Sequence, residues 1–226
     1  MTRRVLVFIL LFATVAVAGW YYARERGGGL AAAFGRPVPY SQEAFTAWLR
    51  EDPANREGFR EFSQFLAEKD VSGVVPDWQL LRTDANLRRP CERPQFLLPP
   101  RSKWNNIVPP LELLRDWVIP ELGKLEVISS YRTQQFNSCI GGASRSKHLG
   151  FHALDLIAPE QQDKREMFRR LCALQSDLGP GKRMGLGAYF RLDIPGKAGR
   201  FHIDTNGYRS WGYSYDAESS GCRLFR

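Results

Sequence analysis

The chain is sparing with histidine and lacks the compact motifs that cysteine forms at many metal sites. Only three of its 226 residues are histidine, and its four cysteines include no Cys-x-x-Cys pair. The missing pair argues against a structural zinc site or a dithiol redox site. No glutamate follows the first histidine, which excludes the helical His-Glu-x-x-His zinc motif. No internal repeat and no run of basic residues occurs, so the net charge of +8 does not indicate a nucleic acid partner.

The few histidines that are present lie beside carboxylates in two short segments. His148 shares one segment with Asp155, and His202 lies in the other. Catalytic zinc takes about three protein ligands drawn from His, Asp, Glu or Cys and leaves a position open for water. His148, Asp155 and His202 fit that count and predict a zinc site if the two segments converge. The alternative is that the histidines are separate surface or core residues.

The first segment, residues 1–26, is expected to lie outside the fold. Two arginines precede an almost unbroken apolar run from Val5 to Tyr22. Its length lies between that of a signal peptide and that of a membrane-spanning helix, which needs about 20 residues. Ala16 to Ala18 could be a cleavage site, but the run continues through Trp20 into aromatics of the kind found at membrane interfaces. We expect a membrane anchor and a periplasmic or extracellular protein, with secretion after cleavage as the alternative.

Export changes what the cysteines and the charge imply. Four cysteines in an oxidising compartment predict two disulfides, and three pairings are possible. We expect Cys139 to pair with Cys172 and Cys91 with Cys222. For an exported chain, the cell wall polymer with its free carboxylates is a better acidic partner than nucleic acid.

The remaining chain divides by composition into three parts. Residues 27–40 form a Gly/Ala/Pro linker, and residues 41–100 a helical and irregular N-terminal extension. Within that extension, Ser41 is predicted to cap a short helix, and a second helix is expected over about 55–69. Residues 101–226 form the main domain.

The main domain reads as an α+β fold with a small antiparallel sheet flanked by helices. A helix is expected from about Leu111 until Pro120 and Gly123 stop it. The domain has too few strand–helix–strand units to form a parallel sheet. The expected strands are 125–128, 153–157, 184–189 and 200–204, and the further expected helices are 134–140 and 161–178.

Several separated motifs of this domain resemble one known family. They are Ile128-Ser129-Ser130-Tyr131-Arg132, Asn137, Gly141-Gly142-Ala143, Ser146-x-His148, Ala153-x-Asp155, Gly187-x-Tyr189, Phe201-His202-Ile203-Asp204 and Arg209-x-Trp211. In this order they resemble the D-Ala-D-Ala carboxypeptidase-type (VanY-like) zinc peptidases and related murein peptidases, which share a metal fold with lysostaphin and sonic hedgehog. The resemblance spans roughly residues 104–211.

The resemblance implies roles for individual residues. His148, Asp155 and His202 would bind Zn²⁺, and Arg132 would orient the substrate and stabilise developing negative charge, which suits a guanidinium. The residues predicted to contact the substrate are Tyr131, Ser146, His152 and Tyr189.

The general base and one turn depart from the family pattern. Many relatives carry Glu or Asp where this chain has Gly199. We expect Asp204 to act as the base, although it could instead orient a ligand histidine, with Asp193 as the reserve or no base at all. At the position where the first motif of the family has glycine, this chain has Phe151, and its glycine, Gly150, comes one residue earlier. The turn could therefore have shifted by one residue. His152 could tune substrate choice, carry protons or face solvent.

The resemblance implies a zinc metallopeptidase that hydrolyses peptidoglycan stem peptides or their cross-links, as a D,D-carboxypeptidase or an endopeptidase. The alternative is a non-catalytic cell-wall-binding or scaffolding protein that retains the fold.

Overall fold

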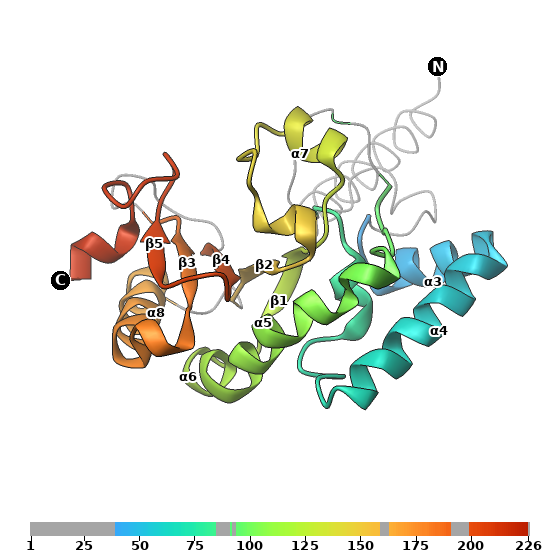
Figure 1. The fold of residues 1–226 in the computed structure, drawn as a ribbon, viewed down its shortest axis with the longest axis horizontal. Helices are drawn as coiled ribbons and strands as arrows, with labels where there is room; N and C mark the ends of the chain where they lie inside the picture. The colour runs from blue at the N-terminus through green and yellow to red at the C-terminus, as the bar shows by residue number, and fades with distance from the viewer. Residues whose placement is uncertain (1–38, 85–90, 92–93, 159–162, 191–198, 226) are drawn as a thin grey trace, which may run out of the picture. The chain divides into compact units, whose positions relative to one another are not determined.

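The computed structural model describes residues 39–84, 91, 94–158, 163–190 and 199–225 (Figure 1). The expected anchor at residues 1–26 and the reserve base Asp193 lie outside these residues. Among the helices that the structure describes, none combines the length and the apolar character needed to cross a membrane. The chain divides into two units, Met1–Asp52 and Pro53–Arg226.

The described part of the first unit is a single capped helix. Helix α3 spans Gln42–Glu51, and the Ser41 hydroxyl accepts a hydrogen bond from the backbone N–H of Ala44 at 3.1 Å. A serine at this position satisfies one of the N–H groups that have no partner within the helix. The predicted N-cap is therefore confirmed.

The second unit begins with helix α4, Pro53–Glu68, close to the predicted helix over 55–69. Proline suits the first helical position because its missing N–H would have no partner there. Phe62 and Leu66 are fully buried, and the Phe62 ring meets the edge of Trp104 at a centroid distance of 5.2 Å. Phe62, the buried aromatic residue of this helix, therefore serves packing.

The helix that Pro120 and Gly123 were expected to stop runs through Pro120 to Leu122. It consists of α5, Val108–Leu113, a wider π-helical turn over Leu114–Val118, and α6, Ile119–Leu122. Within a regular helix, proline lacks a donor and its ring collides with the carbonyl four residues back. The π turn, in which the N–H of Ile119 bonds to the carbonyl of Leu114, widens the backbone just before the proline. Gly123, at φ 82°, then ends the helix.

The sheet has five strands in the order β1-β2-β4-β3-β5. The α+β class is confirmed, but the sheet is mixed rather than antiparallel, because β3 and β5 pair in parallel while the other pairs are antiparallel. The strands are β1 Glu126–Ser129, β2 Ala153–Ile157, β3 Gly185–Ala188, β4 Arg200–Asp204 and β5 Arg209–Trp211.

Strand alternation separates the core from a polar face. On β4, Phe201 and Ile203 are fully buried, whereas Arg200, His202 and Asp204 alternate with them and face the other side of the sheet. Two capped helices accompany the sheet, α7 Gln134–Cys139 with Thr133 as N-cap and α8 Lys164–Leu178 with Asp163 as N-cap.

The turn before β2 has not shifted. Phe151 itself adopts the left-handed conformation, at φ 60° and ψ 33°, although its side chain is fully buried. Its ring lies 6.0 Å from that of Phe62 and 6.3 Å from that of Tyr131. Burial of the phenyl group therefore offsets the backbone cost that glycine would avoid at this position.

The expected disulfide pairing is wrong. Cys91 pairs with Cys139 and Cys172 with Cys222, with Cα–Cα distances of 6.0 Å and 5.4 Å. Pairing requires Cα atoms within about 7 Å, a distance that sequence order does not reveal. Cys172 lies on α8, against which the last short helix, Gly221–Phe225, packs.

Replacing both Cys172 and Cys222 by serine should lower the free energy of unfolding by about 2–4 kcal/mol, because the unfolded chain regains the freedom of the closed loop. Chemical denaturation without reductant measures the loss. Peptide mapping without reduction provides the control for connectivity. A cross-linked peptide joining Cys139 to Cys172 would contradict the structure.

Candidate metal centre

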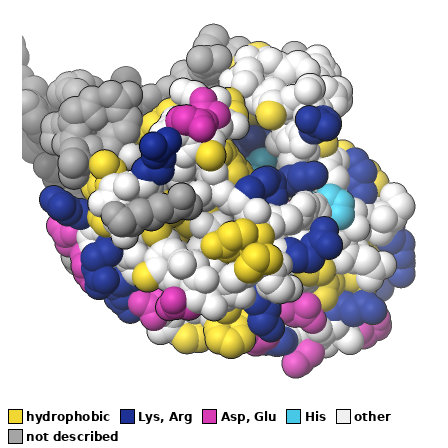
Figure 2. Space-filling model, turned by 60° about the vertical axis from the view of Figure 1, so that its left-hand side comes forward, with side chains coloured by type: hydrophobic (Ala, Val, Ile, Leu, Met, Phe, Trp, Pro, Cys, Tyr) yellow, Lys and Arg dark blue, Asp and Glu magenta, His cyan; other side chains and the backbone are white. Residues whose placement is uncertain are grey.

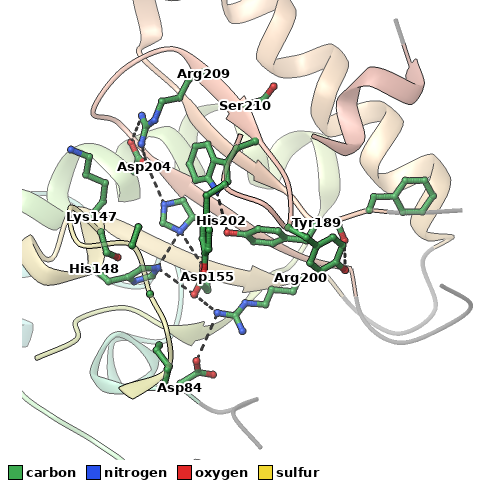
Figure 3. Close-up of a pocket in the computed structure, with 18 of the residues that line it drawn as sticks. Asp84, Lys147, His148, Asp155, Tyr189, Arg200, His202, Asp204, Arg209 and Ser210 are labelled. Atoms are coloured by element: carbon green, nitrogen blue, oxygen red, sulfur yellow. Dashed lines mark hydrogen bonds and ion pairs between the residues drawn. The ribbon is translucent and has the colours of Figure 1, made fainter. Parts of the chain in front are cut away.

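A pocket of about 930 Å³ lies over the polar face of β2 and β4 (Figure 3). Figure 2 shows Lys and Arg side chains gathered around the histidines visible on that face of the molecule. The acidic, basic and histidine side chains that line the pocket are Asp84, Asp155, Asp204, His148, His202, Arg132, Arg145, Lys147, Lys164, Arg200 and Arg209.

The three predicted zinc ligands converge in this pocket and are almost completely buried. Asp155 and His202 are register partners on neighbouring strands, and His148 comes from the short helical turn Lys147–Gly150 just before β2. His148 Nε2 lies 3.1 Å from His202 Nδ1 and 3.2 Å from Asp155 Oδ2, and His202 Nδ1 lies 3.1 Å from Asp155 Oδ1. Ligand atoms of tetrahedral zinc, each about 2.0–2.1 Å from the metal, lie about 3.3 Å apart. Counting one ligand atom from each residue, the three atoms lie within 4.8 Å of one another, so the three side chains could hold one zinc ion.

His148 is held with one nitrogen turned toward the cluster. Its Nδ1–H donates to the backbone carbonyl of Ser130 at 2.5 Å, which leaves the Nε2 lone pair facing His202 and Asp155. Burial, together with the nearby Arg132, lowers the pKa of His148 to about 4. The imidazole is therefore neutral near pH 7, the form that binds a metal.

His202 is held from its other nitrogen by Asp204. Its Nε2 lies 3.1 Å from Asp204 Oδ2, so Nδ1 faces the cluster. Asp204 also accepts hydrogen bonds from Arg209, at 2.7 and 3.1 Å, and from the backbone of Asn206. Burial raises the pKa of Asp204, but these hydrogen bonds outweigh it and lower the pKa overall.

Asp204 therefore does not lie where a general base would be expected to lie. Residues two apart on a strand do share a face, as predicted, but at this spacing the carboxylate reaches the outer nitrogen of His202 rather than the ligand atoms. Its oxygens bond to His202, Arg209 and Asn206. Such an outer carboxylate typically orients a metal-binding histidine.

Two arginines converge on the ligand carboxylate of Asp155. Arg200 lies 2.5 Å from Asp155 Oδ2, and Arg132 makes a short ion pair with the same oxygen. Both guanidinium groups lie 3.8 Å from the buried Asp84. Burial raises the pKa of Asp155, but Arg200, His148 and Arg132 hold it well below its usual range. Arg132 thus lies at the site, where it contacts Asp155 instead of an open position for substrate.

Arg200 and Asp84 are site residues that were not predicted from the sequence. Arg200 could have been found, because it precedes His202 by two positions on a predicted strand and so shares its face. Asp84 comes from the irregular segment after the short helix Asp77–Leu81, where no periodicity marks it.

The residues predicted to contact substrate divide into two groups. Ser146 and Tyr189 line the pocket, whereas Tyr131 and His152 are not among its lining residues. The Tyr131 ring packs edge-on against Phe151, and Lys103 lies 4.8 Å above its centroid. The His152 ring folds over Gly150, where an added Cβ would lie 2.5 Å from the ring.

Comparison with known proteins points in the same direction as this geometry. Residues 110–184 match the model of the family Peptidase M15, about a third of the chain. The matched stretch includes Arg132, His148 and Asp155 and ends before His202. Peptidases of this family are zinc-dependent, so the match supports an M15-type metallopeptidase without distinguishing the VanY-like branch. No curated protein and no solved structure matches the chain.

Replacing Asp204 by asparagine should weaken zinc binding about 10–100-fold, because the charge that orients and polarises His202 is lost. Competition with a chromophoric chelator measures the affinity. The exposed Asp177→Asn variant is the matched control and should bind zinc as the wild type does. Equal affinities in Asp204→Asn and the wild type would contradict the role given to Asp204.

Zinc affinity should rise with pH until His202 has lost its proton. Burial lowers the pKa of His202, but hydrogen bonds to Asp155 and Asp204 outweigh it and raise the pKa above the usual 6.5. Below that pKa zinc must displace a proton, so affinity should increase about tenfold per pH unit and level off above it. Calorimetry in buffers of different ionisation enthalpy counts the released proton. An affinity that does not change between pH 5.5 and 6.5 would refute this assignment.

Proposed function

We propose that this chain is an exported zinc peptidase that hydrolyses peptide bonds in peptidoglycan stem peptides or their cross-links. The observation that carries the proposal is the buried cluster of His148, Asp155 and His202 in the lining of the pocket, whose candidate ligand atoms all lie within 4.8 Å of one another. The match of residues 110–184 to Peptidase M15 supports the same class.

The side chains around the cluster would support catalysis by fixing the ligands. When bound, zinc would polarise the scissile carbonyl and lower the pKa of its water to about 7. The Ser130 carbonyl and Asp204 hold the two imidazoles in the required tautomers. Arg132 and Arg200 hold Asp155 Oδ2, which fixes the orientation of the third ligand.

The charge of the pocket favours a substrate with free carboxylates. Its three aspartates all contact arginine side chains, whereas Arg145, Lys147 and Lys164 make no ion pair among the described residues. These three cations leave the pocket with positive charge for an acidic ligand. Stem peptides carry free carboxylates, and both a D,D-carboxypeptidase and an endopeptidase would meet them.

The proposed location follows from the leader. An apolar N-terminal segment after two arginines would anchor the protein in the membrane, or direct its secretion after cleavage, and place the main domain on the periplasmic or extracellular face. The cell wall polymer is present in that compartment.

One observation favours a second candidate, a wall-binding protein without turnover. At Gly199, where many relatives carry the general base, an added Cβ would collide with Met167. No carboxylate can therefore stand there without repacking, and Asp204 is committed to His202 and Arg209. A protein that binds zinc and wall but releases no fragment would fit this candidate.

The deciding experiment measures zinc content and peptidoglycan digestion with the full chain. The wild type should hold about one zinc ion and release muropeptides. His202→Ala should lose both, because it removes a ligand. His152→Ala is the matched control, since His152 lies outside the pocket lining, and it should keep the zinc.

Each other result has a definite meaning. Zinc at one per chain without release of muropeptides would favour the wall-binding candidate. A wild type without zinc would refute the metal centre, and zinc retained in His202→Ala would refute His202 as a ligand.

A further inference from the structure

This inference rests on the proposed function, peptide hydrolysis. That reaction builds negative charge on the oxygen of the scissile carbonyl. A hydrogen-bond donor aimed at that oxygen is among the largest contributions to such catalysis. The sequence assigned this role to Arg132. In the structure the Arg132 guanidinium contacts Asp155, Asp84 and the Ser129 hydroxyl instead. Another donor beside the cluster would be better placed.

The Tyr189 hydroxyl lies beside the metal ligands because of one glycine. Gly187 pairs with His202 across β3 and β4. A Cβ at Gly187 would lie 2.9 Å from the Tyr189 hydroxyl oxygen and 2.9 Å from His202 Cβ. The absent side chain therefore leaves space in which the tyrosine folds back against His202. Figure 3 shows the hydroxyl end of Tyr189 directed toward His202 and Asp155.

The hydroxyl has its hydrogen free to donate. Trp211 Nε1 lies 3.3 Å from the Tyr189 oxygen. Since the indole nitrogen can only donate, the tyrosine oxygen must be the acceptor in this hydrogen bond. No acceptor for the tyrosine hydrogen occurs among the residues that the structure describes. It therefore remains available to a ligand in the pocket.

The surroundings hold both rings in place. Trp211 lies on β5, its ring meets that of His202 at 5.1 Å, and Arg209 lies 4.8 Å from its centroid. The Tyr213 hydroxyl donates to the backbone carbonyl of Tyr189 at 3.0 Å. A donor held in this way needs little reorganisation when charge develops. A phenol, with an ordinary pKa of about 10, keeps its hydrogen at neutral pH.

We propose that Tyr189 is a catalytic residue, whose hydroxyl donates a hydrogen bond to the substrate carbonyl oxygen as negative charge develops there. The hydrogen stays on the tyrosine throughout, so no proton transfer is involved. Trp211 is a positioning residue that acts through Tyr189, and Gly187 provides the space that Tyr189 occupies.

The test compares Tyr189→Phe with the wild type in the full chain. Losing one such donor should lower kcat about 10²–10³-fold while KM and zinc content stay close to the wild-type values. Tyr208→Phe is the matched control, because Tyr208 is exposed and does not line the pocket. It should retain wild-type kcat.

A binding measurement separates this role from general damage to the site. A phosphinate analogue of a stem peptide carries a tetrahedral anionic centre, so its affinity should fall in Tyr189→Phe by about the factor lost in kcat/KM. The affinity of an uncleavable peptide with a planar carbonyl should be unchanged. Calorimetry with the zinc-loaded proteins measures both.

The possible failures can be told apart. Equal kcat in Tyr189→Phe and an active wild type would overturn this inference and leave the proposed function standing. Loss of zinc in Tyr189→Phe would show that the tyrosine is structural or a ligand. A wild type that hydrolyses no peptidoglycan peptide would overturn the proposed function, and this inference with it.

Discussion

The antiparallel pairing of β2 with β4 is the constraint on which the rest of the site depends. Its register sets Asp155 opposite His202, so two ligands converge without any contribution from a loop. The same alternation turns Phe201 and Ile203 into the core, and burial of these side chains fixes the register. A slip by one residue would turn the polar side chains of β4 into the apolar core and separate the candidate ligands. Folding and the assembly of the candidate metal cluster therefore rely on one set of interactions.

Around this pair, charge is balanced in two separate groups. Arg132 and Arg200 neutralise Asp155 and Asp84, while Arg209 neutralises Asp204. Buried carboxylates of this kind would otherwise be costly to desolvate. Because all three aspartates have arginine partners, the remaining pocket cations are left for ligands. The site can thus combine a His-His-Asp cluster whose carboxylate is balanced by arginines with a pocket that attracts anions.

The sequence predicted those parts of the structure that local patterns encode. Strands β2 and β4, the helix over Pro53–Glu68 and the three ligands follow from alternation, helical periodicity and motif order. Strand β5 was missed because three residues give too little pattern, and the π turn before Pro120 has no sequence signal. The disulfides, Asp84 and the inward packing of Tyr131 depend on which segments meet in space. Arg200 was overlooked although strand alternation marks it.

The Cys172–Cys222 bond closes the segment that follows β5 onto α8. That segment carries Tyr213, which lines the pocket beside Trp211 at the end of β5. This part of the pocket lining is therefore tied by a bond that forms only where thiols are oxidised. A chain folded in a reducing cytosol would retain its sheet but lose this tie. The shape of the pocket would then depend on whether the protein had folded in an oxidising or a reducing compartment.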